Sequence, residues 1–214
     1  MKHPTFFGID LTSTETKPSA CLGLDSKSQL VYLGFLTADK DIIALLNFYS
    51  PEVIAIDAPL SLPLGLCCLE ENCSCQPKFP RKNRQCDEEL RRYGIPCYPT
   101  SKKTFVKDLI YRGIQLKTSI VRQVPQAGHI IEVYPFASKV CLFGKTVPPK
   151  TTKQGVSFLR EKLAEILPSL KAYSDILDHN LCDAAVAAYT ALLYHEDRAK
   201  ALGNIEEGLI FIPD

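Results

Sequence analysis

The chain has 214 residues, of which 46% are hydrophobic and 23% are charged. These values are typical of a globular protein with one domain, and they exclude a disordered or low-complexity chain. The formal net charge is only +1, so a polyanion such as nucleic acid would have to bind at a local basic patch instead of through the field of the whole molecule.

The first residues and the apolar runs bear on the cellular compartment. The opening Met-Lys-His-Pro-Thr is too short and too polar for a signal peptide. No apolar run approaches the ~20 residues that a membrane-spanning helix needs. We therefore expect a cytoplasmic protein that has no membrane partner.

The first quarter of the chain predicts the beginning of a sheet. Three short apolar runs, around residues 6–11, 19–24 and 29–35, predict an antiparallel meander. Residues 39–49 then have the apolar period of a helix, and residues 53–57 form a nearly continuous apolar run that is typical of a strand buried on both faces. A strand, a helix and a strand in this order imply a parallel pairing.

The middle of the chain interrupts this pattern. Residues 59–80 contain four prolines and four cysteines and show no periodicity, which indicates an irregular segment. The remaining expected elements are two helices, a strand and two long helices, over residues 83–93, 104–122, 129–135, 157–173 and 181–202. We therefore predict one α/β domain over residues 1–214. Its mixed sheet, an antiparallel meander followed by parallel strands, is flanked by helices and interrupted by a Cys/Pro-rich basic insertion over residues 59–100.

Four acidic residues lie at the boundaries of these elements: Asp10, Asp57, Glu132 and Asp183. The first three lie at or near the ends of strands, and Asp183 lies in the first turn of the last long helix. Strand-end acids are often turn formers, and an acid in a first turn favours the helix dipole. If the three strands are neighbours, however, their ends share one edge of the sheet. Clustered carboxylates repel one another and normally need a cation, and hard oxygen ligands suit Mg²⁺ or Mn²⁺.

This cluster leads to a functional expectation, a metal-dependent nuclease. Two divalent ions about 4 Å apart can activate a water and stabilise the leaving oxygen in phosphodiester cleavage. We expect Asp10 to bridge both ions and the other three acids to complete the ligand shells. Placement of Asp10 and Asp57 on opposite edges would argue against this function, as would fixed basic partners for Glu132 and Asp183.

Short motifs along nearly the whole chain carry a family resemblance. They are Gly8-Ile9-Asp10, Ile56-Asp57-Ala58-Pro59, Arg84-Gln85-Cys86-Asp87, Glu132-Val133-Tyr134-Pro135, Cys182-Asp183-Ala184-Ala185 and Gly208-Leu209-Ile210-Phe211. Their order and spacing resemble the domain-of-unknown-function family 429. That family is regarded as containing predicted nucleases of the ribonuclease H-like fold. The resemblance implies a ribonuclease H-like sheet and places the four acids on the acidic positions of the family.

Six of the nine cysteines gather in or near the insertion: Cys67, Cys68, Cys73, Cys75, Cys86 and Cys97. Without a secretory signal, clustered cysteines more often bind a metal than form disulfides. We expect Cys68, Cys73, Cys75 and Cys86 to hold zinc or an iron–sulfur cluster, with Cys67 as a substitute for Cys68. The alternative is a set of free or packing thiols.

A basic stretch overlaps the insertion. Residues 76–107 contain nine Lys or Arg against three Asp or Glu, with aromatic residues between them. Basic charge together with stacking rings is a common means of holding a nucleic-acid backbone and its bases. The expected contacts to DNA or RNA come from Arg81, Lys82, Arg84, Lys102 and Lys103. The alternative is a solvated helix face.

Two other functions are compatible with the same residues. Residues 8–17 also resemble the first phosphate loop of the sugar-kinase, actin and Hsp70 ATPase superfamily, which would make the chain an ATP-binding protein. However, Leu11-Thr12 replaces the usual glycine, and there is no second glycine-rich phosphate loop. The other alternative is a non-catalytic module that binds nucleic acid or protein through the cysteine segment and the basic helix.

Overall fold

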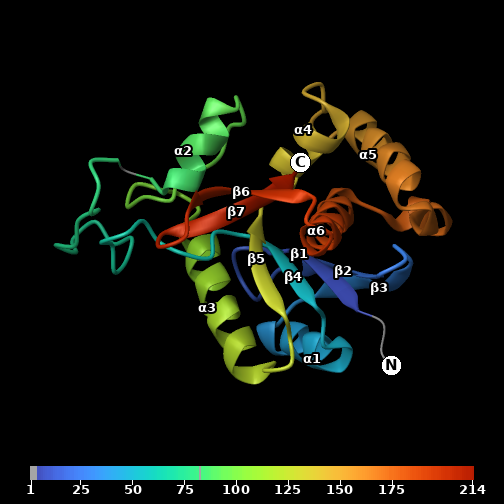
Figure 1. Cartoon of the computed structure of the whole chain (residues 1–214), viewed down its shortest axis with the longest axis horizontal. Coiled ribbons are helices and arrows are strands. Elements are labelled where there is room, and N and C mark those ends of the chain that lie inside the picture. Colours follow the sequence, from blue (N-terminus) through green and yellow to red (C-terminus); the bar gives the residue numbers. More distant parts are fainter. Residues whose placement is uncertain (1–3, 82) are drawn as a thin grey trace.

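The computed structural model describes residues 4–81 and 83–214, which form a seven-stranded sheet with helices on both faces (Figure 1). The strand order is β3-β2-β1-β4-β5-β7-β6. The strands are β1 (Thr5–Asp10), β2 (Ser19–Asp25), β3 (Leu30–Leu36), β4 (Val53–Asp57), β5 (His129–Val133), β6 (Ala199–Asn204) and β7 (Gly208–Pro213). Strands β1, β2 and β3 are antiparallel, whereas β4, β5 and β7 continue the sheet in parallel from β1. The predicted mixed sheet is therefore confirmed.

The helices divide between the two faces of the sheet because the side chains of a strand alternate. They are α1 (Asp39–Tyr49), α2 (Gln85–Arg92), α3 (Lys107–Gln123), α4 (Pro135–Phe143), α5 (Lys153–Ile166), the 3-10 helix η1 (Pro168–Ile176) and α6 (His179–His195). Phe7 and Ile9 of β1 pack with α1 and α3, whereas Phe6, one residue earlier, packs with α6 on the opposite face.

Helix α6 lies directly against β1. A Cβ at Gly8 would stand 2.1 Å from the carbonyl oxygen of Ala184 and 2.2 Å from the amide nitrogen of Ala188. Only a glycine on the strand and small residues on the helix allow this approach, which explains the alanine-rich sequence of α6. The contact also holds Asp183 close to the end of β1.

Three helix predictions differ from the structure. The last long helix ends at His195, and residues 199–204 form β6 instead of a further turn of helix. The helix expected over residues 157–173 is α5 followed by η1, and the break lies at Pro168, which cannot donate the hydrogen bond that an α-helix interior requires. Helix α4 was not predicted; Pro135 begins it at a position where a missing N–H costs nothing.

The insertion follows β4 directly. Between β4 and α2 the described residues contain no helix and no strand, as the sequence predicts. Among residues 4–81 and 83–214, no helix combines the length and the apolar composition that crossing a bilayer requires.

Candidate functional site

Three of the four predicted acids meet at one edge of the sheet. Asp10 is the last residue of β1 and Asp57 the last residue of β4, and the two are directly paired in the parallel register. Asp183 comes from the first turns of α6. Each of the three residues offers a carboxylate oxygen, and these oxygens all lie within 4.8 Å of one another.

The environment of this cluster favours the protonated form of its acids. Burial, and then the negative charge of Asp183, raise the pKa of Asp10 to about 7. Burial followed by the charges of Asp10 and Asp183 raises the pKa of Asp57 well above its usual value. The charge of Lys150, hydrogen bonding to Asp57 and the charge of Lys139 oppose the rise in the pKa of Asp10 without cancelling it. Without a cation, therefore, this carboxylate pair is best satisfied when it keeps a proton.

Asp183 has two lysine partners that differ in accessibility. Lys139 of α4 donates to Asp183 Oδ1 at 2.7 Å, and its side chain is only 1% exposed. Lys150 donates to Asp183 Oδ2, and its side chain is 42% exposed. Burial lowers the pKa of Lys150, but the charge and the hydrogen bond of Asp183, together with the charges of Asp10 and Asp57, outweigh this effect and raise it to about 12. Lys139 is thus a fixed partner, whereas Lys150 can move away.

The sequence analysis identified neither lysine as a partner of the acids. Lys139 is the single charged residue of residues 133–143, an otherwise apolar or small run, and this isolation was the available signal. Three carboxylates against two ammonium groups leave the cluster with an excess of one negative charge when all are ionised.

Glu132 does not join the cluster, so the four-carboxylate arrangement is wrong. Its two carboxylate oxygens accept hydrogen bonds from Arg84 at 2.6 and 2.7 Å, and Oε2 also accepts from the backbone N–H of Leu60 at 2.8 Å. Arg84 is 1% exposed and also pairs with Asp87. Glu132 therefore joins β5 to the start of the insertion and to α2, as a buried structural ion pair.

Three of the five predicted substrate-binding cations contact other parts of the protein in the structure. Arg84 is held in this buried ion pair, although it also lines a cavity beside Asp57. Arg81 pairs with Glu207 at 2.7 Å, and Lys102 donates to the carbonyl oxygen of Cys73. Lys103 is exposed, and Lys82 lies outside the described residues.

A small cavity that opens to solvent lies beside Asp57. Its wall is largely apolar, with Leu90, Val106 and Leu109, and it includes the rings of Tyr98 and Tyr134. Tyr98 packs edge-on against the exposed ring of Phe105 at 4.7 Å between centroids. The cluster of acids therefore adjoins a surface that suits a flat apolar ring.

Arg112 of α3 holds the loop between β1 and β2 in place. One guanidinium nitrogen donates to the carbonyl oxygens of Thr12 and Thr14 and to the Thr12 hydroxyl, each at 2.8 Å. The other donates to Asp39 Oδ1 at 2.7 Å. The carbonyl oxygens and the hydroxyl of this loop are thus engaged with the protein.

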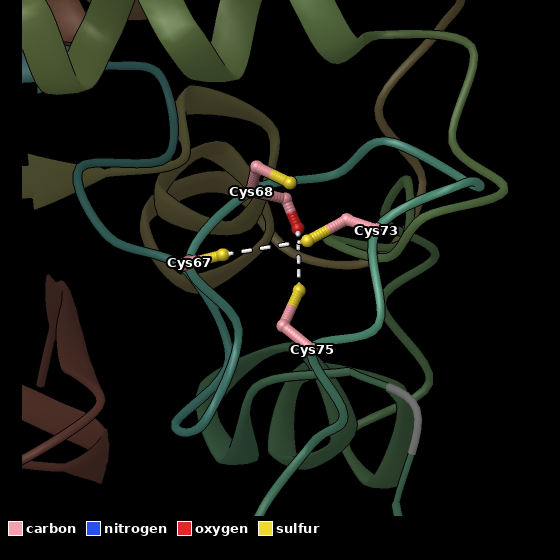
Figure 2. Close-up of side chains that lie close together, drawn as sticks. All are labelled: Cys67, Cys68, Cys73 and Cys75. Atoms are coloured by element: carbon pink, nitrogen blue, oxygen red, sulfur yellow. Dashed lines mark hydrogen bonds between the residues drawn. The ribbon is translucent and has the colours of Figure 1, made fainter.

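The cysteines of the insertion gather, but not in the predicted set. Figure 2 shows the side chains of Cys67, Cys68, Cys73 and Cys75 around one point, and each offers a sulfur within 4.8 Å of the others. The predicted fourth ligand, Cys86, is instead buried in α2 and packs with Leu90 and Leu202. Cys67 takes its place, because α2 turns the Cys86 side chain towards the sheet.

Comparison with known proteins gives a family and no function. No curated protein matches the chain. The model of one protein family matches residues 8–207 and so includes the ends of β1 and β4 and the whole of α6. With nearly all of its length matched, the chain belongs to the family described as "Protein of unknown function (DUF429)".

Proposed function

We propose that the chain is a divalent-metal-dependent nuclease that hydrolyses phosphodiester bonds of DNA or RNA. One observation carries the proposal: the carboxylates of Asp10, Asp57 and Asp183 converge within 4.8 Å at the edge where β1 and β4 end. Clusters of acids of this kind are costly to hold together unless a cation binds between them.

The donors present fit a hard divalent cation such as Mg²⁺ or Mn²⁺. All three are carboxylates, and hard oxygen ligands suit these ions. The excess negative charge of the cluster supports a cation there. The exposed Lys150 can withdraw when an ion binds, whereas Lys139 stays and holds one oxygen of Asp183. The buried partners of Glu132 (Arg84) and Asp183 (Lys139) are the arrangement named above as an argument against this function, and they count against a site of four free acids. The proposal is therefore limited to a smaller site formed by Asp10, Asp57 and the second carboxylate oxygen of Asp183.

Each residue of the site would then have a separate role in the reaction. A bound divalent cation supplies an activated water and stabilises negative charge on phosphate oxygens. Asp10 and Asp57 hold the cation and position the water, and Asp183 completes the ligand set. Lys150 supplies positive charge beside the phosphate, and the cavity at Tyr98 and Tyr134 receives the base of a neighbouring nucleotide by stacking.

The ATP-binding alternative has less support. A phosphate loop of the first strand would need its backbone free to face the phosphates. Arg112 instead occupies the interior of this loop and ties Thr12 and Thr14 to α3.

A cytoplasmic location, which the sequence predicts, is part of the nuclease proposal and agrees with nine cysteines that are all free thiols.

The test is cleavage of labelled substrates by the purified full chain. Single-stranded and double-stranded DNA and RNA are each incubated with Mg²⁺, with Mn²⁺ or with EDTA. We expect cleavage that requires the ion and that falls by roughly 10²-fold or more in Asp57→Asn, because a ligand carboxylate is lost. Substrate binding, measured separately by fluorescence anisotropy, should persist in this variant.

Asp41→Asn is the matched control. Asp41 lies exposed in the first turn of α1, so the same chemical change there should leave cleavage unchanged. The proposal fails if no substrate is cleaved with either ion, or if Asp57→Asn and Asp41→Asn cleave equally well. ATP hydrolysis without cleavage would favour the alternative.

A further inference from the structure

We propose that Cys67, Cys68, Cys73 and Cys75 form a structural zinc site that closes the tip of the insertion. The site is separate from the aspartate cluster and does not depend on the proposed nuclease activity. Four thiols from a segment of nine residues point to one centre (Figure 2), and Zn²⁺ in structural sites is held by four such ligands in a tetrahedron.

The sulfur spacing favours a single ion. With a Zn–S bond of about 2.3 Å, the sulfurs of a tetrahedral site stand about 3.8 Å apart. The Sγ atoms of Cys67 and Cys73 are 3.6 Å apart, and none of the four is more than 4.8 Å from another. A disulfide would require about 2.05 Å. A multi-iron cluster spreads its thiolates over several iron atoms and so holds them farther apart.

The local fold brings the two halves of this segment together. The N–H of Lys78 donates to the carbonyl oxygen of Leu64 at 2.6 Å, which closes a loop around the four cysteines. Gly65 has a φ of +94°, and a Cβ there would stand 2.5 Å from the carbonyl oxygen of Gln76. The crossing of the two arms thus depends on glycine, and it preorganises the ligands.

The loop needs a crosslink because it has almost no core of its own. Between Leu66 and Lys78 the only buried side chain in the described structure is Leu69. Irregular segments of this length are uncommon in compact domains unless they are functional or tied down. A structural zinc ion contributes folding free energy directly to such a segment.

The zinc-bound loop would also position one side of the cavity. The Tyr111 hydroxyl of α3 accepts from the N–H of Leu69 at 2.7 Å and donates to Glu70 at 3.0 Å. Lys102 donates to the carbonyl oxygen of Cys73, and this lysine lies between Tyr98 and Val106 of the cavity wall. An ion at the cysteines therefore fixes the loop against α3 and against the segment that forms that wall.

The direct test is metal content. Full-length protein purified from zinc-supplemented cells should contain one zinc per chain by mass spectrometry of the elements, and Asp183→Asn should contain the same amount. Replacement by Co²⁺ should give the intense visible bands and the thiolate-to-metal charge transfer of a tetrahedral thiolate site, which carboxylate ligands do not produce. Cys73→Ser and Cys75→Ser should lose the ion and these bands.

Cys86→Ala is the control that separates this ligand set from the one predicted by spacing, and it should keep the ion. Alkylation of the wild-type protein tests the same ligand set without any substitution, so it is informative even when a variant does not fold. Cys67, Cys68, Cys73 and Cys75 should resist alkylation until a chelator is added, whereas the exposed Cys141 should react at once. Wild-type protein without zinc or cobalt binding, a disulfide among the four, bound iron, or loss of zinc in Cys86→Ala would each overturn the proposal.

Discussion

The Asp10→Asn substitution offers the sharpest prediction, because it should stabilise the metal-free protein and abolish its response to metal. In the free site Asp10 is 8% exposed and lies beside two other carboxylates. An asparagine keeps the size of the side chain and removes one negative charge. We therefore expect less repulsion in the folded state and a weaker site for any divalent cation.

The magnitude follows from the pKa shift. The pKa of Asp10 rises from 3.8 to about 7, mainly through burial and then through the charge of Asp183. A raised pKa means that the folded state binds more protons than the unfolded state, so the free energy of unfolding falls as pH rises from about 4 to 7 and is then constant. At about 1.4 kcal/mol per pKa unit, the upper limit of this loss is about 4 kcal/mol.

Urea unfolding of the wild type and of Asp10→Asn at pH 5 and pH 8, each with EDTA and with Mn²⁺, measures both effects. In EDTA the variant should gain stability over the wild type on going from pH 5 to pH 8, by up to about 2.7 kcal/mol, because only the two pH units between 5 and the raised pKa of about 7 fall in this interval. With Mn²⁺ the wild type should recover, by about 2.7 kcal/mol at a concentration of 100 times Kd. The variant should respond far less.

Two results would refute this reasoning. One is a variant whose stability relative to the wild type does not change between pH 5 and pH 8 in EDTA, since the Asp10 carboxyl would then titrate normally in the folded state. The other is an equal gain from Mn²⁺ in both proteins, which would exclude Asp10 as a ligand.

Three further substitutions test neighbouring parts of the structure. Lys150→Ala should tighten Mn²⁺ binding several-fold in calorimetric titration, because it removes a cation that competes for Asp183; weaker binding would contradict this. Glu132→Gln should lower the free energy of unfolding by about 3 kcal/mol, because it breaks a buried ion pair with Arg84, while Mn²⁺ affinity stays the same. Weaker Mn²⁺ binding by Glu132→Gln would contradict this and would indicate that Glu132 is a metal ligand. Gly8→Ala should cost about 4 kcal/mol or more in urea unfolding, because its Cβ would overlap the backbone of α6; a near-normal stability would disprove that packing.

The strand ends show how far the sequence could predict the site. Apolar runs that stop at Asp10 and Asp57 located two strand ends correctly, and parallel pairing is enough to bring such ends together. Glu132 also lies near the end of a strand, yet its carboxylate is turned to Arg84, one residue before α2. The pattern of the chain marks where an acid lies along a strand but not which cation reaches it.

The cysteines and lysines illustrate the same limit. Spacing alone left Cys86 as a plausible ligand, and only the path of α2 turns it into the core. Lys139 became visible as a partner of Asp183 only with α4, a short helix whose apolar sequence has no clear helical period. Helix ends were also misjudged, since the alanine-rich run of α6 carries no local signal strong enough to end it at His195.

The amino-acid sequence by itself determined the mixed sheet, the irregular insertion and the clustering of most of the acids and cysteines, because the period of apolar residues and the order of the elements are local properties of the chain. The tertiary structure alone decided which charges pair: Glu132 with Arg84, and Asp183 with Lys139 and Lys150. Pairing depends on distances between side chains that are tens of residues apart in the chain, and those distances exist only once the helices have packed on the sheet.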